Sequence, residues 1–189
     1  MSLIVTLSDP ESNNLIATLK PGRNRLLALL MLDAGLRVGE AVQLRWFDIF
    51  DGESARSVIR LPPSITKTNA SRNLPTTERL KTCIGNHFQW TPRFEPEFTR
   101  SWVFPGRENG AHITTRQVRR IIFDASRKAL GFSIFPHALR HTFATRLMRC
   151  SSVRVVQDLL GHKSLKSTQI YTHPDSQDLS KAINSLNAR

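Results

Sequence analysis

The chain has 189 residues, of which 40% are hydrophobic, and this size suits one globular domain or at most two small ones. Its 27 lysines and arginines against 15 aspartates and glutamates give a formal net charge of +12. So large an excess favours a protein that binds nucleic acid over one whose positive surface only keeps it in solution. No stretch approaches the roughly 20 apolar residues of a membrane span, and Cys83 and Cys150 indicate no disulfide framework or zinc site, so we expect a cytoplasmic protein without membrane contact.

Two helices are predicted near the N-terminus. Residues 8–11, Ser-Asp-Pro-Glu, form a helix start with a capping side chain followed by proline and acid in the first turn. The segment 24–34 is almost continuous Leu, Ala and Met, so it should run through the core rather than along the surface. Gly35 is a candidate left-handed stop for this second helix.

A possible charged site follows directly. Arg37 and Glu40 stand three residues apart. Taken alone, they would most simply be an exposed ion pair worth a few tenths of a kcal/mol, about 0.2–0.5. The alternative is that they belong to a functional site built with residues further along the chain.

Between residues 57 and 76 the pattern changes to short runs of residues that favour β-strands, at 58–61, 64–68 and 72–75. Asn-Ala-Ser at 69–71 supplies a turn between the last two runs. We therefore expect a small antiparallel sheet with Lys67 at a hairpin.

Helical periodicity returns between residues 77 and 90, and 102–105 (Trp-Val-Phe-Pro) is predicted to pack in the core as an extended segment. The next helix should begin after Thr114 or Thr115, end before Gly131, and carry a basic outer face. Such a face can lie on or in a DNA groove, or it can simply be solvated. Its residues are Arg116, Arg119, Arg120, Arg127 and Lys128.

The stretch 136–173 holds the only tyrosine, Tyr171, and four of the six histidines. A helix beginning at Pro136 would carry His137, Arg140 and His141 in its first two turns. Their spacing places His137 beside Arg140 or beside His141.

A short helix from 153 to 160 should stop at Gly161 and present His162. The stretch as a whole therefore offers a hydroxyl nucleophile, imidazoles and a guanidinium, with no carboxylate beside the tyrosine. An arginine fork matches phosphate oxygens, and a hydroxyl can form a covalent intermediate when its proton is removed. This set suits a phosphodiester better than an acyl group or a sugar.

The order of these pieces resembles the tyrosine recombinases, the phage integrase family. The matching segments are His-Ala-Leu-Arg-His at 137–141, Leu-Leu-Gly-His at 159–162 and Tyr-Thr-His at 171–173. Two upstream segments agree with the family as well: Leu-Arg-Val-Gly-Glu at 36–40 and Thr-Lys-Thr at 66–68. The implied fold is that of the family's catalytic domain, a DNA breaking-rejoining fold that is mainly α with a small antiparallel β-sheet (α+β).

The resemblance also implies an activity: site-specific recombination, in which Tyr171 attacks a DNA phosphorus and leaves a 3′-phosphotyrosine. In this scheme Arg37 and Arg140 neutralise the phosphate, His137 is the base, and Lys67 is the acid for the leaving hydroxyl. No metal, nucleotide or other cofactor is expected. The implied catalytic residues are Arg37, Lys67, His137, Arg140, His162 and Tyr171, with Glu40 and His141 in support.

We expect a single catalytic domain at 1–189, without a counterpart of the family's usual N-terminal DNA clamp. A last amphipathic helix is expected at 175–186, with Leu179 and Ile183 on its apolar face. In the family such a helix commonly docks on a neighbouring protomer, although it can also fold back on its own domain. We expect double-stranded DNA as the partner and self-assembly on it, as a tetrameric synapse.

Three alternatives stay open. The chain can be a DNA-binding regulator that retains these residues without cleaving, or a type IB topoisomerase that uses the same chemistry only to relax DNA. A metal site at His137, His141, His162 and Cys150 has a helical His-x-x-x-His spacing. It lacks the acidic residue that a hydrolytic zinc helix carries, because Arg140 precedes His141.

Overall fold

The computed structural model describes residues 5–91, 100–108 and 110–161. His162, Tyr171 and the helix expected at 175–186 lie outside this part of the chain. The chain divides into two compact units, residues 1–143 and 144–189, and each is described by itself. The described elements are mostly helices with one two-stranded sheet, so the predicted fold class is confirmed.

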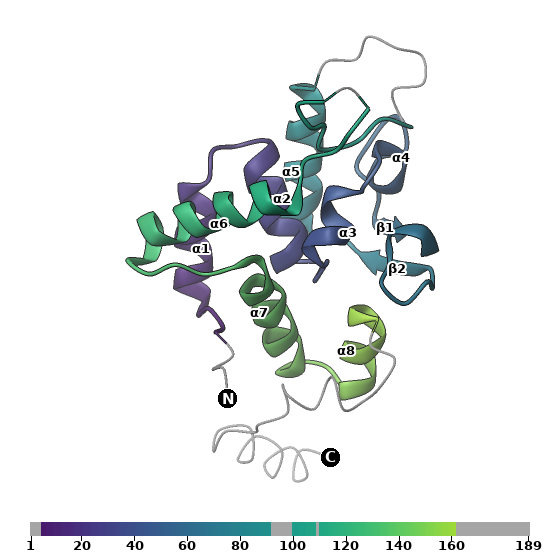
Figure 1. Cartoon of the computed structure of the whole chain (residues 1–189). Coiled ribbons are helices and arrows are strands. Elements are labelled where there is room, and N and C mark those ends of the chain that lie inside the picture. The colour runs from purple at the N-terminus through teal and green to yellow at the C-terminus, as the bar shows by residue number, and fades with distance from the viewer. Residues whose placement is uncertain (1–4, 92–99, 109, 162–189) are drawn as a thin grey trace. The chain divides into compact units, whose positions relative to one another are not determined.

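The first unit is built around a central apolar helix, α2 (Arg23–Leu32), which contacts α1, α3, α5 and α6 (Figure 1). Every residue from Leu26 to Leu32 is buried, as its apolar sequence predicts. The preceding helix, α1 (Asp9–Thr18), begins at Ser8 with a reciprocal capping box to Glu11, which satisfies two backbone donors at its start. Both N-terminal helices are therefore confirmed.

Two short helices and one longer one complete the core around an aromatic cluster. They are α3 (Val38–Val42), α4 (Trp46–Ile49) and α5 (Glu78–Gln89), the last capped by Thr77. Trp46 is fully buried and meets the ring of Phe88 edge-on at 5.2 Å between centroids. This aromatic contact joins α4 to α5, although the two strands of the sheet separate these helices in the chain.

The sheet pairs β1 (Val58–Leu61) with β2 (Arg72–Pro75) in antiparallel register, so that Leu61 faces Arg72. The strand predicted at 64–68 is wrong. Its residues follow Pro62 and Pro63, and proline lacks the N–H that a ladder needs, so the chain instead forms a short 3-10 helix, η1 (Pro63–Ile65). Lys67 still lies in the loop that joins the two strands, as predicted.

The segment 102–105 contributes to the core, as predicted, but it bends at Val103 and Phe104 and leaves Pro105 exposed, so it is not a continuous extended segment. Val103 and Phe104 are fully buried, and Trp102 forms an isolated bridge with Arg45. The Arg45 guanidinium also lies 3.8 Å from the centre of the Trp102 ring, a cation–π contact that occupies this aromatic side chain.

The long helix α6 (Thr115–Leu130) is capped by Thr114 and stopped by Gly131 at φ +80°, and it packs along α1. Its buried positions are Val118, Ile122 and Ser126. Ser126 is accommodated because its hydroxyl donates to one backbone carbonyl and accepts from the Ile134 amide.

The next helix, α7 (Pro136–Met148), starts at the predicted proline. In the second unit the described part is the end of α7 and α8 (Val153–Leu160), which Ser152 caps and Gly161 ends in the left-handed conformation. The predicted helix before His162 is thus confirmed. No helix among the described residues has the length and apolarity needed to cross a membrane.

Candidate active site

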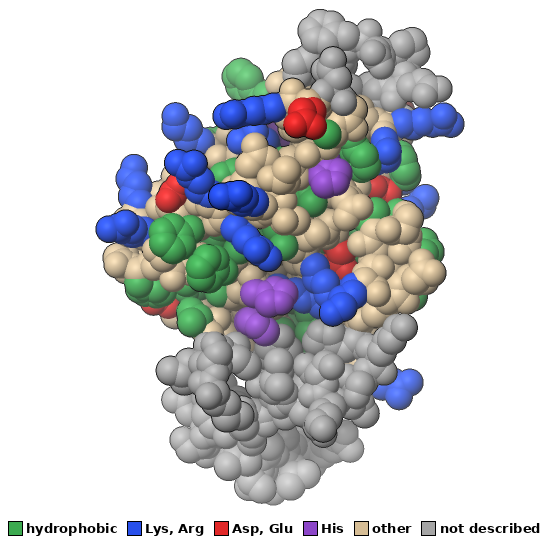
Figure 2. Space-filling model, viewed as in Figure 1, with side chains coloured by type: hydrophobic (Ala, Val, Ile, Leu, Met, Phe, Trp, Pro, Cys, Tyr) green, Lys and Arg blue, Asp and Glu red, His purple; other side chains and the backbone are tan. Residues whose placement is uncertain are grey.

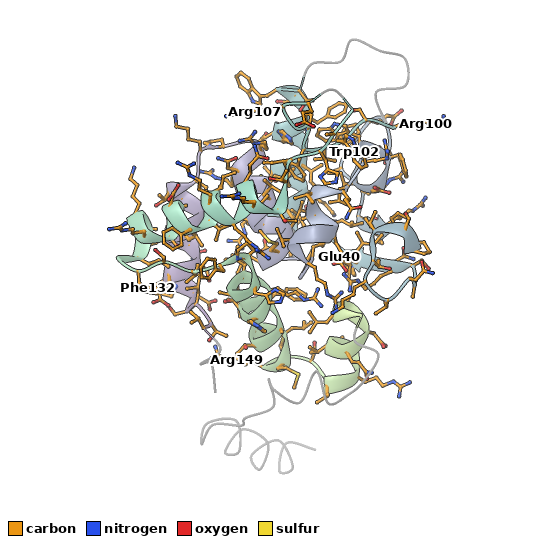
Figure 3. All side chains as sticks on the ribbon, in the orientation of Figure 1. Glu40, Arg100, Trp102, Arg107, Phe132 and Arg149 are labelled. Atoms are coloured by element: carbon orange, nitrogen blue, oxygen red, sulfur yellow. The ribbon has the colours of Figure 1, made fainter. Side chains whose placement is uncertain are left out.

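A buried carboxylate organises the site. Glu40, in the first turn of α3, is 1% exposed (Figure 3). Its Oε1 accepts a hydrogen bond from Arg37 Nη1 at 2.9 Å, and its Oε2 accepts from the Arg37 backbone amide at 2.8 Å. Arg72 Nη2 donates to Oε2 at 2.8 Å, and Arg140 Nη1 lies 3.9 Å from the same oxygen. We call these four residues the Glu40 cluster.

The Glu40 cluster carries more positive than negative charge. Three guanidinium groups, each with a formal charge of +1, surround a single carboxylate. A buried ion pair is tolerated when its charges are compensated by good hydrogen bonds, and here one carboxylate serves three cations. The excess charge makes the cluster suited to binding an anion, and arginine forks match phosphate oxygens in particular.

The three arginines differ in their access to solvent. The Arg37 side chain is 21% exposed, whereas those of Arg72 and Arg140 are 8% and 6% exposed. Arg140 is held from two sides, because its Nη1 also donates to the backbone carbonyl of Gly35. This contact explains why the left-handed turn at Gly35 matters: it directs a carbonyl toward the second turn of α7.

Two imidazoles lie beside the arginines. His137 and His141 are one turn apart on α7, with ring centroids 5.5 Å from each other and planes at 67°. The adjacency of His137 and His141 is one of the two pairings that the sequence left open. Burial lowers the pKa of His141, and the charges of His137 and Arg140 lower it further. Neutral imidazoles can accept a proton near pH 7.

The electrostatics of His137 connect it to several distant elements. Burial lowers its pKa below the ordinary value of 6.5, and positive charges lower the pKa further: those of Arg140, Arg37, Arg119 and Lys67. These groups come from α7, the start of α3, α6 and the β1–β2 loop. The fold thus brings Arg37, Lys67 and Arg140 into the electrostatic environment of His137. Glu40 lies beside Arg37, and His141 lies beside His137.

The remaining two predicted catalytic residues, His162 and Tyr171, lie outside the described residues. No three His, Cys, Asp or Glu side chains gather as a metal ion would need in the ranges that the structure covers.

The basic face predicted on α6 is exposed. Figure 2 shows Lys and Arg side chains gathered over this helix, and all five predicted members are solvent-accessible. They are Arg116, Arg119, Arg120, Arg127 and Lys128. The acidic side chain of Asp124 makes a long contact on this face, 3.7 Å from Arg120 Nε to a carboxylate oxygen, between two exposed side chains. Such a pair is worth little, so the face keeps its positive potential.

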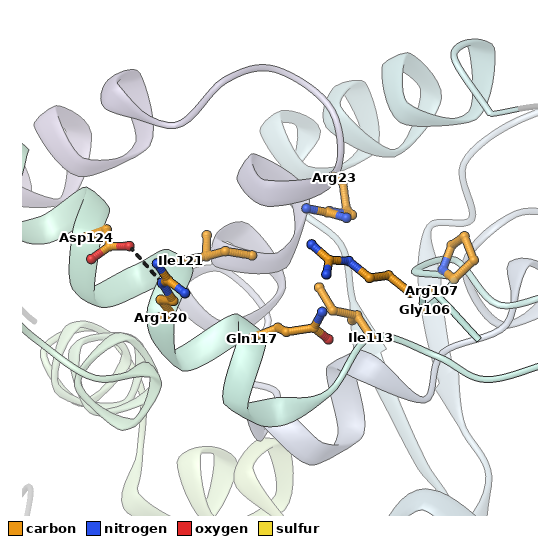
Figure 4. Close-up of a pocket in the computed structure, with 9 residues that line it drawn as sticks. Arg23, Gly106, Arg107, Ile113, Gln117, Arg120, Ile121 and Asp124 are labelled. Carbon is orange, nitrogen blue, oxygen red and sulfur yellow. Dashed lines mark ion pairs between the residues drawn. The ribbon is translucent and has the colours of Figure 1, made fainter.

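Sequence reasoning missed three further arginines. Arg23 and Arg107 come from α2 and from the loop after residue 105, and they line a pocket of about 330 Å³ together with Arg120 of α6 (Figure 4). Arg72 of the Glu40 cluster is the third. No local pattern could have found Arg23 or Arg107, because the two residues are 84 positions apart and meet only in the folded chain.

Comparison with known proteins identifies the family of this chain. The model of the phage integrase family matches residues 6–178. The tyrosine recombinase XerA of Pyrococcus furiosus is 34% identical over 185 residues, which cover 96% of this chain and 62% of XerA. This chain spans between about half and three-fifths of the length of the curated relatives compared.

Solved structures share the fold. A crystal structure of XerA recombinase matches with a TM-score of 0.76 at 27% identity, over 100% of this chain and 67% of that one. The integrase of transposon Tn1549, solved in complex with circular intermediate DNA, matches with a TM-score of 0.76 at 19% identity, over 98% of this chain and 68% of that one. On the strength of the family match, the resemblance read from the histidine, arginine and tyrosine segments is confirmed, and the chain belongs to the phage integrase family of tyrosine recombinases.

Proposed function

We propose that this chain is the catalytic part of a site-specific recombinase that cleaves and rejoins double-stranded DNA through a 3′-phosphotyrosine. The observation that carries the proposal is the convergence on His137. A neutral imidazole, two arginines and a lysine from three separate elements, which are α7, the start of α3 and the β1–β2 loop, share one electrostatic environment around a cationic, carboxylate-anchored cluster.

The arginines act on the phosphate. Arg37, the most exposed member of the Glu40 cluster, and Arg140 hold the non-bridging oxygens while negative charge grows on them during attack. Preorganised donors of this kind stabilise the transition state because they are already oriented by Glu40 and by the Gly35 carbonyl. Removing one such donor costs on the order of 3 kcal/mol, or roughly a hundredfold in rate.

Proton transfer completes the cycle. A tyrosine has a pKa of about 10, so Tyr171 needs a base during attack, and His137 takes its proton. The new bond joins Tyr171 Oη to phosphorus, and the bond from phosphorus to the 5′ oxygen breaks. Lys67 gives its proton to that oxygen, so a 5′-hydroxyl leaves. Religation reverses these steps, and the phosphotyrosine preserves the bond energy without a nucleotide. We assign His162 a hydrogen bond to the same phosphate.

DNA would be held largely through its phosphates. The exposed row on α6 and the pocket lined by Arg23, Arg107 and Arg120 supply positive charge, which also accounts for part of the net charge of +12. We further propose that copies assemble on DNA as a tetrameric synapse through the helix expected at 175–186, and that the protein acts in the cytoplasm. Relatives come from a bacterium and an archaeon, Haemophilus ducreyi and Pyrococcus furiosus.

The central test is covalent attachment. The protein is incubated with a pool of nicked random-sequence duplexes, in which cleavage releases a short strand and traps the adduct, and attached DNA is recovered after denaturation. We expect attachment with wild type, with or without EDTA, and none with Tyr171→Phe, which should still bind the recovered duplex. DNA binding without attachment by wild type would support the non-cleaving regulator instead.

Assembly is tested separately on the recovered duplex. Replacing Leu179 and Ile183 with serine should reduce multimeric complexes and cleavage more than binding by a single protomer, as measured by gel shift. Normal assembly accompanied by a lowered melting temperature would place this helix in its own core and contradict the docking proposal.

A further inference from the structure

Arg72 is the member of the Glu40 cluster that the chemistry above does not use. It is the first residue of β2, five positions after Lys67, and its side chain is only 8% exposed. Its Nη2 lies 2.8 Å from Glu40 Oε2. Burial lowers its pKa, and the neighbouring Glu40 carboxylate opposes that effect, so the pair is an ion pair within the interior. A side chain so enclosed is poorly placed to contact DNA.

The Lys67 loop needs an anchor. Lys67 is exposed, and within the described residues its ammonium group has no hydrogen-bond or ion-pair partner. Inside the loop the Thr66 hydroxyl bonds to the backbone of Ala70, which shapes the turn but does not fix it to the rest of the domain. The position of the loop is therefore set where its two strands attach.

The sheet is held to the core by buried side chains of both strands, Ile59, Leu61 and Leu74. A polar attachment of β2 runs through Glu40. Oε2 of this carboxylate accepts from Arg72, accepts from the Arg37 backbone, and is the oxygen that Arg140 approaches. One buried atom thus joins the strand that follows the Lys67 loop to both arginines assigned to the phosphate. A shift of β2 against α3 would move the lysine relative to the phosphate they hold.

We propose that Arg72 is a positioning residue, which fixes the Lys67 loop to the Glu40 cluster so that the lysine reaches the leaving 5′ oxygen. The inference rests on the proposed function. It assigns Arg72 an effect on the departure of the leaving group, and none on the neutralisation of the phosphate.

The test changes the leaving group. A 5′ alcohol needs a proton as it departs, whereas a thiol has a pKa near 8.5 and departs as a thiolate without an acid. The recovered duplex is prepared with the ordinary 5′ oxygen and with sulfur in its place at the cleaved phosphate. Single-turnover attachment rates are then measured for wild type, Arg72→Gln, Lys67→Ala and Arg37→Ala.

With oxygen, Arg72→Gln should be slower than wild type by about 10- to 100-fold, within the range that positioned acid catalysis contributes. With sulfur, its rate and that of Lys67→Ala should return to within about threefold of wild type, whereas Arg37→Ala should stay slow. The double variant Arg72→Gln/Lys67→Ala should be no slower than Lys67→Ala, because both changes remove one function. Arg72→Lys keeps the charge, so its attachment rate with oxygen should lie between those of wild type and Arg72→Gln. If the glutamine variant does not fold, the oxygen and sulfur rates are compared with Arg72→Lys instead.

Three results would overturn the inference: an unchanged oxygen rate in Arg72→Gln, a defect that sulfur does not relieve, or additive losses in the double variant. If Arg72 only stabilised the fold, sulfur would not relieve the defect of Arg72→Gln. If wild type attaches to neither duplex, the proposed function fails first. If wild type, Lys67→Ala and Arg37→Ala behave as expected and only Arg72→Gln does not, the inference alone is wrong.

Discussion

At the level of single residues, the site depends on one carboxylate with several tasks. Glu40 receives hydrogen bonds from Arg37 and Arg72 and lies near Arg140, and it is itself inaccessible to water. On a surface, the Arg37–Glu40 ion pair would contribute little to stability. In the proposed site, the same carboxylate orients the arginines that would bind the phosphate. The importance of Glu40 comes from its burial and from Arg72 and Arg140, which the fold brings beside it.

Replacing Glu40 with glutamine should destabilise the protein strongly. The change leaves three guanidinium groups without their shared counter-charge, and breaking a buried ion pair costs about 3–5 kcal/mol. The free energy of unfolding, measured with urea, gives the result. Glu78→Gln is the control, because its ion pair with Lys81 involves a side chain that is 87% exposed and is worth about 0–1 kcal/mol. Equal losses in the two variants would contradict the central role of Glu40.

The pH dependence of cleavage should report His137. The pKa of His137 lies below 6.5, so the imidazole is mostly neutral at pH 6.5 and above. The cleavage rate should therefore fall only when the pH drops below 6.5 and the imidazole becomes protonated. Arg119→Gln removes one of the charges that lower this pKa, so the acidic limb should move to higher pH. Arg127 is an exposed arginine on the same helix that does not lower the pKa of His137, so Arg127→Gln should leave the acidic limb of the pH profile unchanged. An acidic limb above pH 6.5 in wild type would argue against His137 as the base.

At the level of helices and strands, the site is held by the junction of α3 with α7 and by the β1–β2 loop. Gly35 stands at that junction with φ +65°, and its carbonyl accepts the hydrogen bond from Arg140. A Cβ at this position would collide with the ring of Phe143 on α7. Both the backbone conformation and the close approach therefore favour glycine.

Gly35→Ala should cost about 1–3 kcal/mol of stability, because a side chain is strained at positive φ and the aromatic ring must move. It should also slow cleavage, since the carbonyl that holds Arg140 shifts. Gly39→Ala is the matched control: no atom lies within 4 Å of its added Cβ, and alanine favours a helix. Thermal melting compares the two. A Gly35→Ala variant as stable as Gly39→Ala would show that α7 is not packed as described.

At the level of the whole protein, exposed basic side chains gather over α6 in the part of the chain that the structure describes (Figure 2). The outer row on α6 continues into the pocket that Arg23 and Arg107 complete. Binding through phosphates releases counterions, so affinity should fall steeply with salt.

The double variant Arg23→Gln/Arg107→Gln should weaken binding to all duplexes alike. It should also reduce the salt slope by up to about 2, because each phosphate that is no longer neutralised lowers the slope by roughly one unit. Gel shifts at several salt concentrations measure this slope. The control is Lys81→Gln, whose charge is already balanced by Glu78 at 2.7 Å and should not contribute. An unchanged slope in the double variant would exclude the pocket from the DNA surface.

The longer helices and the family could be predicted from the amino-acid sequence, whereas the short helices α3 and α4 were not. Caps and stops act within a few residues, so Ser8, Thr114, Gly131 and Gly161 could be read directly as helix ends. The ordered segments at 36–40, 66–68, 137–141, 159–162 and 171–173 carried the resemblance in the same way.

Which side chains meet could be learned only from the folded chain. Glu40 collects Arg72 from 32 positions away, and Arg140 binds a carbonyl 105 positions away, so neither contact has a local signature. The strand expected at 64–68 failed for a related reason. Alternating β-type residues indicate a strand only where a neighbour can pair with them, and Pro62 and Pro63 leave that segment to bend between the two strands that do pair.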